Sequence, residues 1–135
     1  MNHLSASEAC EAHRKRITDR FASILRQRFE DLDEGHTLQA AEHAASAYIG
    51  YPEDWIRRPE TALLNYPKLV VCECGKRSVA EYHYGIGWTP VDPEWKMHLG
   101  FEPMVSYWSC GQPNHKATVW QELFILEDIQ QVTEP

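Results

Sequence analysis

The chain has 135 residues, of which 43% are hydrophobic and 24% charged, a composition that excludes disorder throughout and is typical of one folded domain. No apolar run approaches the roughly 18 residues that a membrane span needs, and the first residues lack the basic and apolar regions of a secretion signal. We therefore expect a cytoplasmic protein without membrane contact.

The net charge of −7 is unevenly distributed. Residues 14–28 carry six basic side chains against one acid, a local charge of +5 that leaves −12 for the rest of the chain. The acidic majority argues against broad binding to duplex DNA, which depends on phosphate neutralisation. It favours a basic partner, such as a protein that handles nucleic acids.

Two helices are predicted at the N-terminal end. Ser5 and Glu8 form a capping box that begins a helix over residues 6–33, and Gly35 is expected to end it. Its predicted core face comprises Ile17, Phe21, Ile24 and Leu25.

Arg14 and Arg28 fall within the apolar arc of the first helix, so they must snorkel, pair with acids or reach an interface. Thr37 is expected to cap a second helix, which Gly50 ends. Its small-residue face predicts close packing against the first helix as a helical hairpin.

The second half of the chain is predicted to be rich in strands. A proline-rich connector over residues 51–67 precedes it, and alternation predicts strands at 69–74, 77–84 and 104–109. Residues 85–103 are rich in glycine and proline and predict a long loop. Residues 117–126 fit a strand or a helix, and we favour a strand.

These elements predict an α+β fold, in which the N-terminal helical hairpin packs on a small antiparallel sheet. We expect one domain over residues 1–135, made of a helical hairpin (1–50), the connector (51–67) and a β-rich part (68–135).

Two short segments carry residues that suit a metal ion. One is Cys72-Glu73-Cys74-Gly75, and the other contains Cys110 and His115 around a turn of glycine, proline and asparagine. Zinc takes four such donors in a tetrahedron, usually as two pairs from two tight turns. The alternative interpretation is that the cysteines are small core residues and the histidine is an ordinary turn residue.

In outline, residues 69–126 resemble a zinc ribbon, or a treble-clef zinc finger if residues 116–128 are helical. The resemblance rests on Cys72, Cys74, Cys110 and His115, and it implies a structural zinc ion with four protein ligands. The sequence departs from that pattern in its Cys-x-Cys spacing and in the 35 residues between Cys74 and Cys110.

Aromatic residues crowd the segment from Tyr82 to Trp108. Trp88 and Trp95 lie in the glycine- and proline-rich stretch and are the expected exposed anchors of a partner surface, with Arg14 and Arg28 as further contacts. The alternative is that the aromatic side chains fill space between sheet and loop.

Three functional hypotheses follow. The first is a non-enzymatic binding or regulatory protein that contacts another protein, a class that includes inhibitors encoded by phages and mobile elements. The second is a zinc-ribbon protein that binds nucleic acid directly. The third is a small hydrolase or nuclease that uses His83, His98 and carboxylates. The sequence contains no phosphate-binding loop and no nucleophile motif, which favours the first.

Overall fold

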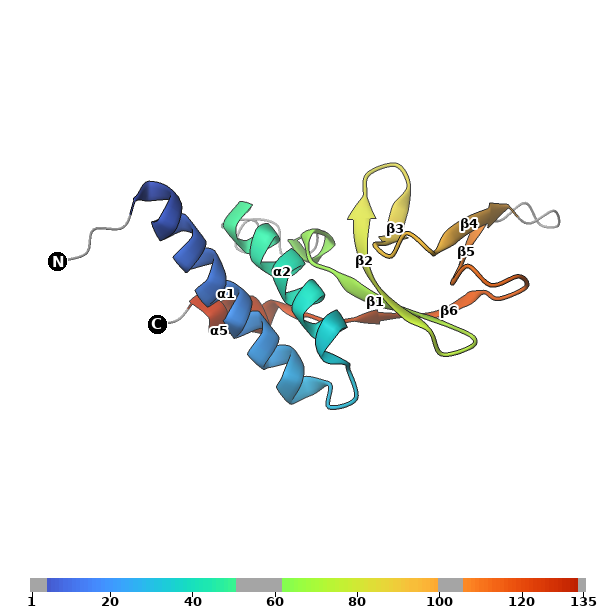
Figure 1. The fold of residues 1–135 in the computed structure, drawn as a ribbon, viewed down its shortest axis with the longest axis horizontal. Helices are drawn as coiled ribbons and strands as arrows, with labels where there is room; N and C mark the ends of the chain where they lie inside the picture. The colour runs from blue at the N-terminus through green and yellow to red at the C-terminus, as the bar shows by residue number, and fades with distance from the viewer. Residues whose placement is uncertain (1–4, 51–61, 100–105, 134–135) are drawn as a thin grey trace. The chain divides into compact units, whose positions relative to one another are not determined.

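The computed structural model describes residues 5–50, 62–99 and 106–133, and it has the predicted α+β composition. Two helices come first, strands follow, and a further helix closes the described chain (Figure 1). The chain divides into two compact units. A helical unit comprises residues 1–66 and 124–135, and a sheet unit comprises residues 67–123. The expected connector at 51–67 lies mostly outside the described residues.

The helical unit is built on an antiparallel pair, α1 (Ala6–Arg28) and α2 (Glu34–Gly50), which run side by side in Figure 1. The predicted capping box begins α1: Ser5 Oγ accepts the Glu8 N–H at 3.1 Å, and the Glu8 carboxylate accepts the Ser5 N–H at 3.3 Å. Ile17, Phe21 and Leu25 are buried as predicted, whereas Ile24 is half-buried.

The boundary between α1 and α2 differs from the prediction. The first helix ends at Arg28, and Gly35 lies inside α2. Asp33 caps α2, because its carboxylate accepts the His36 N–H at 3.1 Å and its carbonyl accepts the Thr37 N–H at 3.0 Å. Thr37 is therefore not the cap; it is buried one turn into the helix, where its hydroxyl donates to the Asp33 carbonyl.

A further helix, α5 (Leu126–Thr133), belongs to the helical unit and was not predicted. Phe124, just before it, packs its ring edge on Phe21 with the ring centroids 5.2 Å apart. Tyr66, which follows the short 3-10 helix η1 (Leu63–Asn65), joins the same aromatic cluster. Residues before and after the sheet unit therefore share one core.

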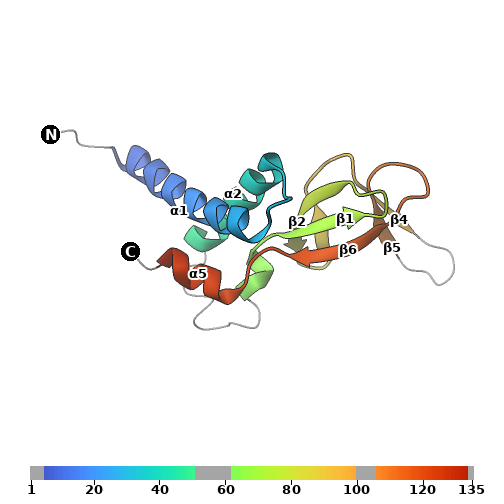
Figure 2. The same ribbon diagram turned by 90° about the horizontal axis from the view of Figure 1, so that it is seen from below.

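The sheet unit contains two antiparallel sheets. The larger has the strand order β3-β2-β1-β6, formed by β1 (Lys68–Cys72), β2 (Arg77–His83), β3 (Gly87–Pro90) and β6 (Ala117–Glu122). Figure 2 shows β2, β1 and β6 side by side. The smaller sheet pairs β4 (Lys96–Leu99) with β5 (Ser106–Ser109).

The strand predictions are partly confirmed. Residues 117–122 form the favoured strand, and β5 lies within the strand expected at 104–109, whose first two residues are outside the described part. The long loop expected at 85–103 is wrong in its described part, because β3 and β4 lie within it. The helices described here include none that is long and apolar enough to cross a bilayer.

One buried cluster of the sheet unit gathers small and aromatic side chains around two cysteines. Its buried members are Val70, Cys72, Ala80, Trp95 and Cys110. Trp95 is only 3% exposed, so its predicted role as an exposed anchor is wrong. It precedes β4 directly, and its side chain belongs to the same buried cluster as Cys72 and Cys110.

Candidate metal centre

The first ligand pair lies where β1 turns into β2. The strand ends at Cys72, and Cys74 lies in the turn, not on the strand as its spacing indicated. The Gly75 N–H donates to the Cys72 carbonyl at 2.8 Å, which closes a tight turn. Gly75 has a φ of +93°, a conformation that glycine adopts without strain. The turn therefore brings the Cys74 side chain back beside Cys72.

The second pair brackets the connection from β5 to β6. Cys110 follows β5 directly, and one residue, Lys116, lies between His115 and β6. The Ser109 hydroxyl braces this turn, since it donates to the Gln112 carbonyl at 3.0 Å and accepts the Gly111 N–H at 3.2 Å. The turn thus holds Cys110 and His115 at a short separation.

Backbone contacts join the two turns. The Glu73 N–H donates to the Lys116 carbonyl at 2.9 Å, which links a residue of one turn to a residue beside His115. Pairing of β1 with β6 continues to Cys72 and Ala117, with a shift of register between Val71 and Cys72. The sheet therefore places both turns at the same end of neighbouring strands.

Gly111 allows a close approach between two backbone segments. A Cβ atom at this position would lie 2.6 Å from the Glu94 carbonyl oxygen, and the φ of Gly111 is +101°. Any other residue would collide with that carbonyl and would also be strained. The glycine after Cys110 is therefore required for the second turn to pack against the segment that contains Trp95.

The four predicted ligands converge. The donor atoms of Cys72, Cys74, Cys110 and His115 all lie within 4.8 Å of one another. An ideal tetrahedron around zinc places two sulfurs about 3.8 Å apart and a sulfur and a nitrogen about 3.6 Å apart. The Cys74 and Cys110 sulfurs are 3.7 Å apart, and the Cys110 sulfur lies 3.5 Å from His115 Nδ1. These two separations match the edges of such a tetrahedron.

The surroundings of Cys72 and Cys110 shift the pKa values of their thiols in opposite directions. Burial raises the pKa of Cys72, but hydrogen bonds from the backbone N–H of Cys74 and from the Cys110 thiol outweigh it, so the pKa lies below its ordinary value. Burial raises the pKa of Cys110, and the Gln112 N–H only partly offsets this because the neighbouring thiols raise it further. In each turn a backbone N–H two residues later in the chain points at a cysteine sulfur: that of Cys74 at Cys72, and that of Gln112 at Cys110. Such hydrogen bonds stabilise a thiolate.

Accessibility also separates the ligands. Cys72 and Cys110 are 2% and 1% exposed, His115 is half-buried, and Cys74 is exposed. The centre therefore has a buried inner side, formed by Cys72 and Cys110, and one exposed ligand residue, Cys74.

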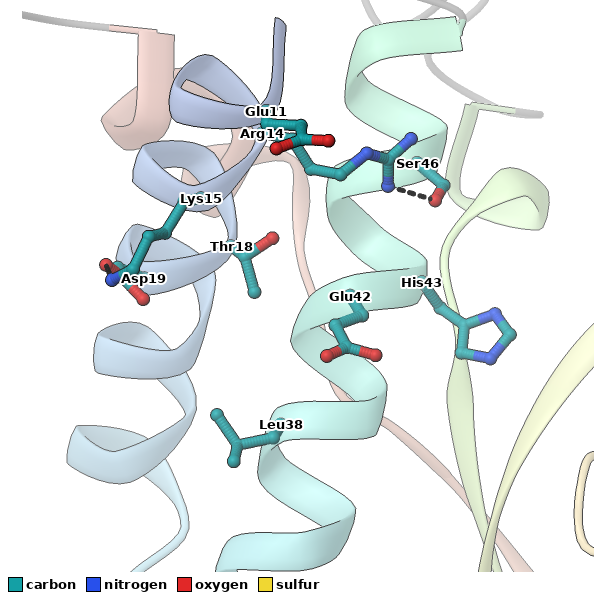
Figure 3. Close-up of a pocket in the computed structure, with 9 residues that line it drawn as sticks. All are labelled: Glu11, Arg14, Lys15, Thr18, Asp19, Leu38, Glu42, His43 and Ser46. Carbon is teal, nitrogen blue, oxygen red and sulfur yellow. Dashed lines mark hydrogen bonds and ion pairs between the residues drawn. The ribbon is translucent and has the colours of Figure 1, made fainter. Parts of the chain in front are cut away.

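The two arginines predicted to contact a partner are engaged within the helical unit. Arg28 forms a two-pronged ion pair with Asp128, whose side chain is 4% exposed. Arg14 Nη1 donates to Ser46 Oγ at 2.8 Å, across a groove of about 570 Å³ between α1 and α2 (Figure 3). The expectation that an arginine on the apolar arc pairs with an acid is confirmed for Arg28.

Trp88 is half-buried, and its neighbours hold it in place. Tyr82, its cross-strand partner, packs against it at 5.7 Å between ring centroids, and Lys68 Nζ lies 4.7 Å from the centre of the indole ring. Sequence reasoning missed two more exposed side chains at the tip of this β2–β3 hairpin. Tyr84 is 97% exposed and Ile86 is 64% exposed. The Gly85 and Gly87 that flank Ile86 were the available signal of a tight hairpin.

The histidines of the hydrolase hypothesis lie apart in the fold. His83 Nε2 is 3.0 Å from Glu81 Oε1 at the exposed end of β2. His98 stacks on Tyr107 in the smaller sheet, with 5.3 Å between ring centroids.

Comparisons with known proteins gave no family. A scan against protein-family models, a search of curated proteins and a search of solved structures each found no match.

Proposed function

We propose that Cys72, Cys74, Cys110 and His115 bind one zinc ion and that this ion is structural. The observation that carries the proposal is the convergence of four donor atoms, within 4.8 Å of one another, from two separate turns. Three thiolates and one imidazole form a donor set that zinc takes in closed structural sites. Hard cations such as Mg²⁺ and Ca²⁺ select oxygen ligands instead.

A structural role follows from the number of donors. Four protein ligands complete a tetrahedron and leave no position for a reacting water, which a catalytic zinc site keeps open. Bound there, the ion ties the β1–β2 turn to the turn before β6, so its binding free energy contributes to folding of the sheet unit.

Elemental analysis of the full chain, purified without added metal or chelator, tests the zinc proposal. We expect about one zinc per chain and a lower melting temperature when a strong chelator removes it. Cys110→Ser should lose the metal and destabilise the sheet unit. Cys10→Ser is the matched control, because Cys10 is an exposed cysteine on α1 outside the cluster, and it should keep both zinc and stability. Metal-free protein whose stability does not respond to added zinc would contradict the proposal.

At the level of biological role, we propose a non-enzymatic cytoplasmic protein that acts by contacting another protein, in the manner of phage- or mobile-element-encoded inhibitors. Three observations support it. The candidate metal centre has a closed donor set, and His83 and His98 lie on different sheets. The exposed pair Tyr84 and Ile86 offers apolar contact area on a short hairpin, a more suitable anchor than the buried Trp95.

Affinity capture with the full chain tests this role. The double variant Tyr84→Ser and Ile86→Ser should lose a specific partner while it keeps zinc and fold. Val119→Ser is the matched control, because Val119 is 48% exposed on β6, away from the hairpin tip, and it should keep the partner. Binding to random oligonucleotides that weakens steeply with salt would instead support the nucleic-acid alternative.

A further inference from the structure

The three sulfurs of the candidate metal centre differ in how an oxidant reaches them. Cys74 is exposed, whereas Cys72 and Cys110 are almost wholly buried. Small oxidants react with thiolates that they can reach, so Cys74 is the first sulfur to be attacked.

The second thiol needed for a disulfide is already beside it. The sulfur of Cys110 lies 3.7 Å from that of Cys74, so bond formation at about 2.05 Å requires a movement of roughly 1.7 Å. Cys74 lies in a turn next to Gly75 and not in a strand, so a small change in the turn can provide that movement without disrupting β1.

Resting on the zinc site proposed above, we propose that the centre is a redox switch, in which hydroperoxides join Cys74 to Cys110 as a disulfide and zinc is released. Only Cys72 and His115 would remain as ligands, which is half of a tetrahedral set. The disulfide joins the same two turns that the metal joins, so the sheet unit stays cross-linked. The bonds from Cys72 and His115 to zinc are lost. Reduction of the disulfide restores all four ligands.

The chemistry balances with a hydroperoxide as the oxidant. The Cys74 thiolate attacks the peroxide oxygen; an S–O bond forms, the O–O bond breaks, and the leaving alkoxide or hydroxide takes a proton. The Cys110 thiolate then attacks the Cys74 sulfur; the S–S bond forms, and hydroxide leaves and is protonated to water. Two thiolates are oxidised by two electrons, and one peroxide is reduced to water and an alcohol, or to two waters.

The test uses the full chain in its purified, metal-loaded form. Zinc content is measured first, because a metal-free protein would contradict the proposed zinc site but not the proposed Cys74–Cys110 disulfide. Hydrogen peroxide is then added, zinc release is followed with a chromogenic chelator, and disulfides are mapped by peptide mass spectrometry. We expect one zinc released for each Cys74–Cys110 disulfide, with reversal by a thiol reductant and added zinc. If the protein contains no metal, the same mapping still tests the disulfide.

Two variants sharpen the test. Cys74→His keeps four donors but removes the accessible sulfur, so peroxide should release its zinc about tenfold more slowly or not at all. Cys10→Ser removes an exposed cysteine outside the cluster, so it should release zinc at the unchanged rate. The switch is overturned if zinc leaves without a Cys74–Cys110 disulfide, if the disulfide joins other cysteines, or if Cys74→His releases zinc as fast as the parent.

Discussion

At the scale of single residues, Trp95 links packing to the candidate metal centre. It is buried beside the cysteines, and its Nε1 atom has no hydrogen-bond partner among the described residues. Trp95→Ala removes a large buried side chain and should cost about 3–5 kcal/mol in the free energy of unfolding. Trp95→Phe keeps an aromatic ring and removes the unsatisfied N–H, so it should cost less, roughly 1–2 kcal/mol.

Urea unfolding of the metal-loaded protein measures both changes. Equal losses in the free energy of unfolding for Trp95→Phe and Trp95→Ala would contradict the expected order of the two variants. They would mean that the indole N–H makes a favourable interaction in solution.

The ligand residues could be predicted from the sequence because their chemistry is local. Each cysteine segment contains a Cys-Gly step, and both glycines adopt a positive φ in the turns. The burial of Trp95 could not be predicted, because it depends on the close approach of Gly111 to Glu94, 17 residues earlier in the chain. Glycine and proline around a tryptophan indicate irregular backbone, not exposure.

At the scale of elements, the stability of α1 depends on one face. Leu25 is fully buried, whereas Leu38 on α2 is 40% exposed. Leu25→Ala should therefore cost on the order of 2–5 kcal/mol in the free energy of unfolding. Leu38→Ala makes the same chemical change at an exposed site and should cost less than about 1 kcal/mol. Chemical denaturation compares the two variants. Similar losses of stability would show that the Leu25 face of α1 does not form the core of the helical unit.

The cap of α2 predicts a dependence on pH. Burial raises the pKa of Asp33, but its hydrogen bonds with His36 outweigh this, so the pKa lies below its usual 3.8. A carboxylate with a lowered pKa stabilises the folded state above its unfolded pKa, and this contribution disappears as the pH falls through its folded pKa. Asp33→Ala should therefore cost about 1 kcal/mol near neutral pH.

Denaturation of the parent and the variant at neutral and acidic pH checks this. The difference in stability should shrink as the pH falls below 3.8. A difference that stays constant into that range would show that the carboxylate does not act as the cap.

The helix boundaries show how far local signals extend. The start of α1 was predictable because the Ser5–Glu8 capping box is complete within four residues. Its end was not, since Gly35 appeared to be a stop signal but lies in the first turn of α2, after the Asp33 cap. Helix α5 is short, and it is held by contacts with residues about a hundred positions earlier, such as Arg28 with Asp128, which the local sequence does not reveal.

At the scale of the whole molecule, the sheet unit is an insertion into the helical unit. The chain leaves the helical unit at Tyr66 and returns at Phe124, whose rings lie 6.1 Å apart in one core. Lys68 and Glu122 are direct partners in the β1–β6 pairing, so the two ends of the insertion are neighbours. Replacing residues 67–123 with a short glycine–serine linker should therefore leave a helical protein that unfolds cooperatively.

Circular dichroism with thermal unfolding tests this deletion. Adding Phe21→Ala to it should abolish cooperative unfolding, because Phe21 is the fully buried centre of the aromatic cluster. A deletion protein that is unfolded from the outset would show that the helical unit depends on the sheet unit for its stability.

The inserted arrangement also has a consequence for the order of events during synthesis. The aromatic cluster around Phe21 needs Phe124, which emerges only after all of residues 67–123 have been translated. At about 5–20 residues per second, these 57 residues take roughly 3–11 s to make. During that interval the apolar face of α1 lacks part of its core, and β6, which completes the larger sheet, is made only just before Phe124. The oldest segment of the nascent chain therefore exposes apolar side chains, and with them a risk of aggregation, for the whole of this interval.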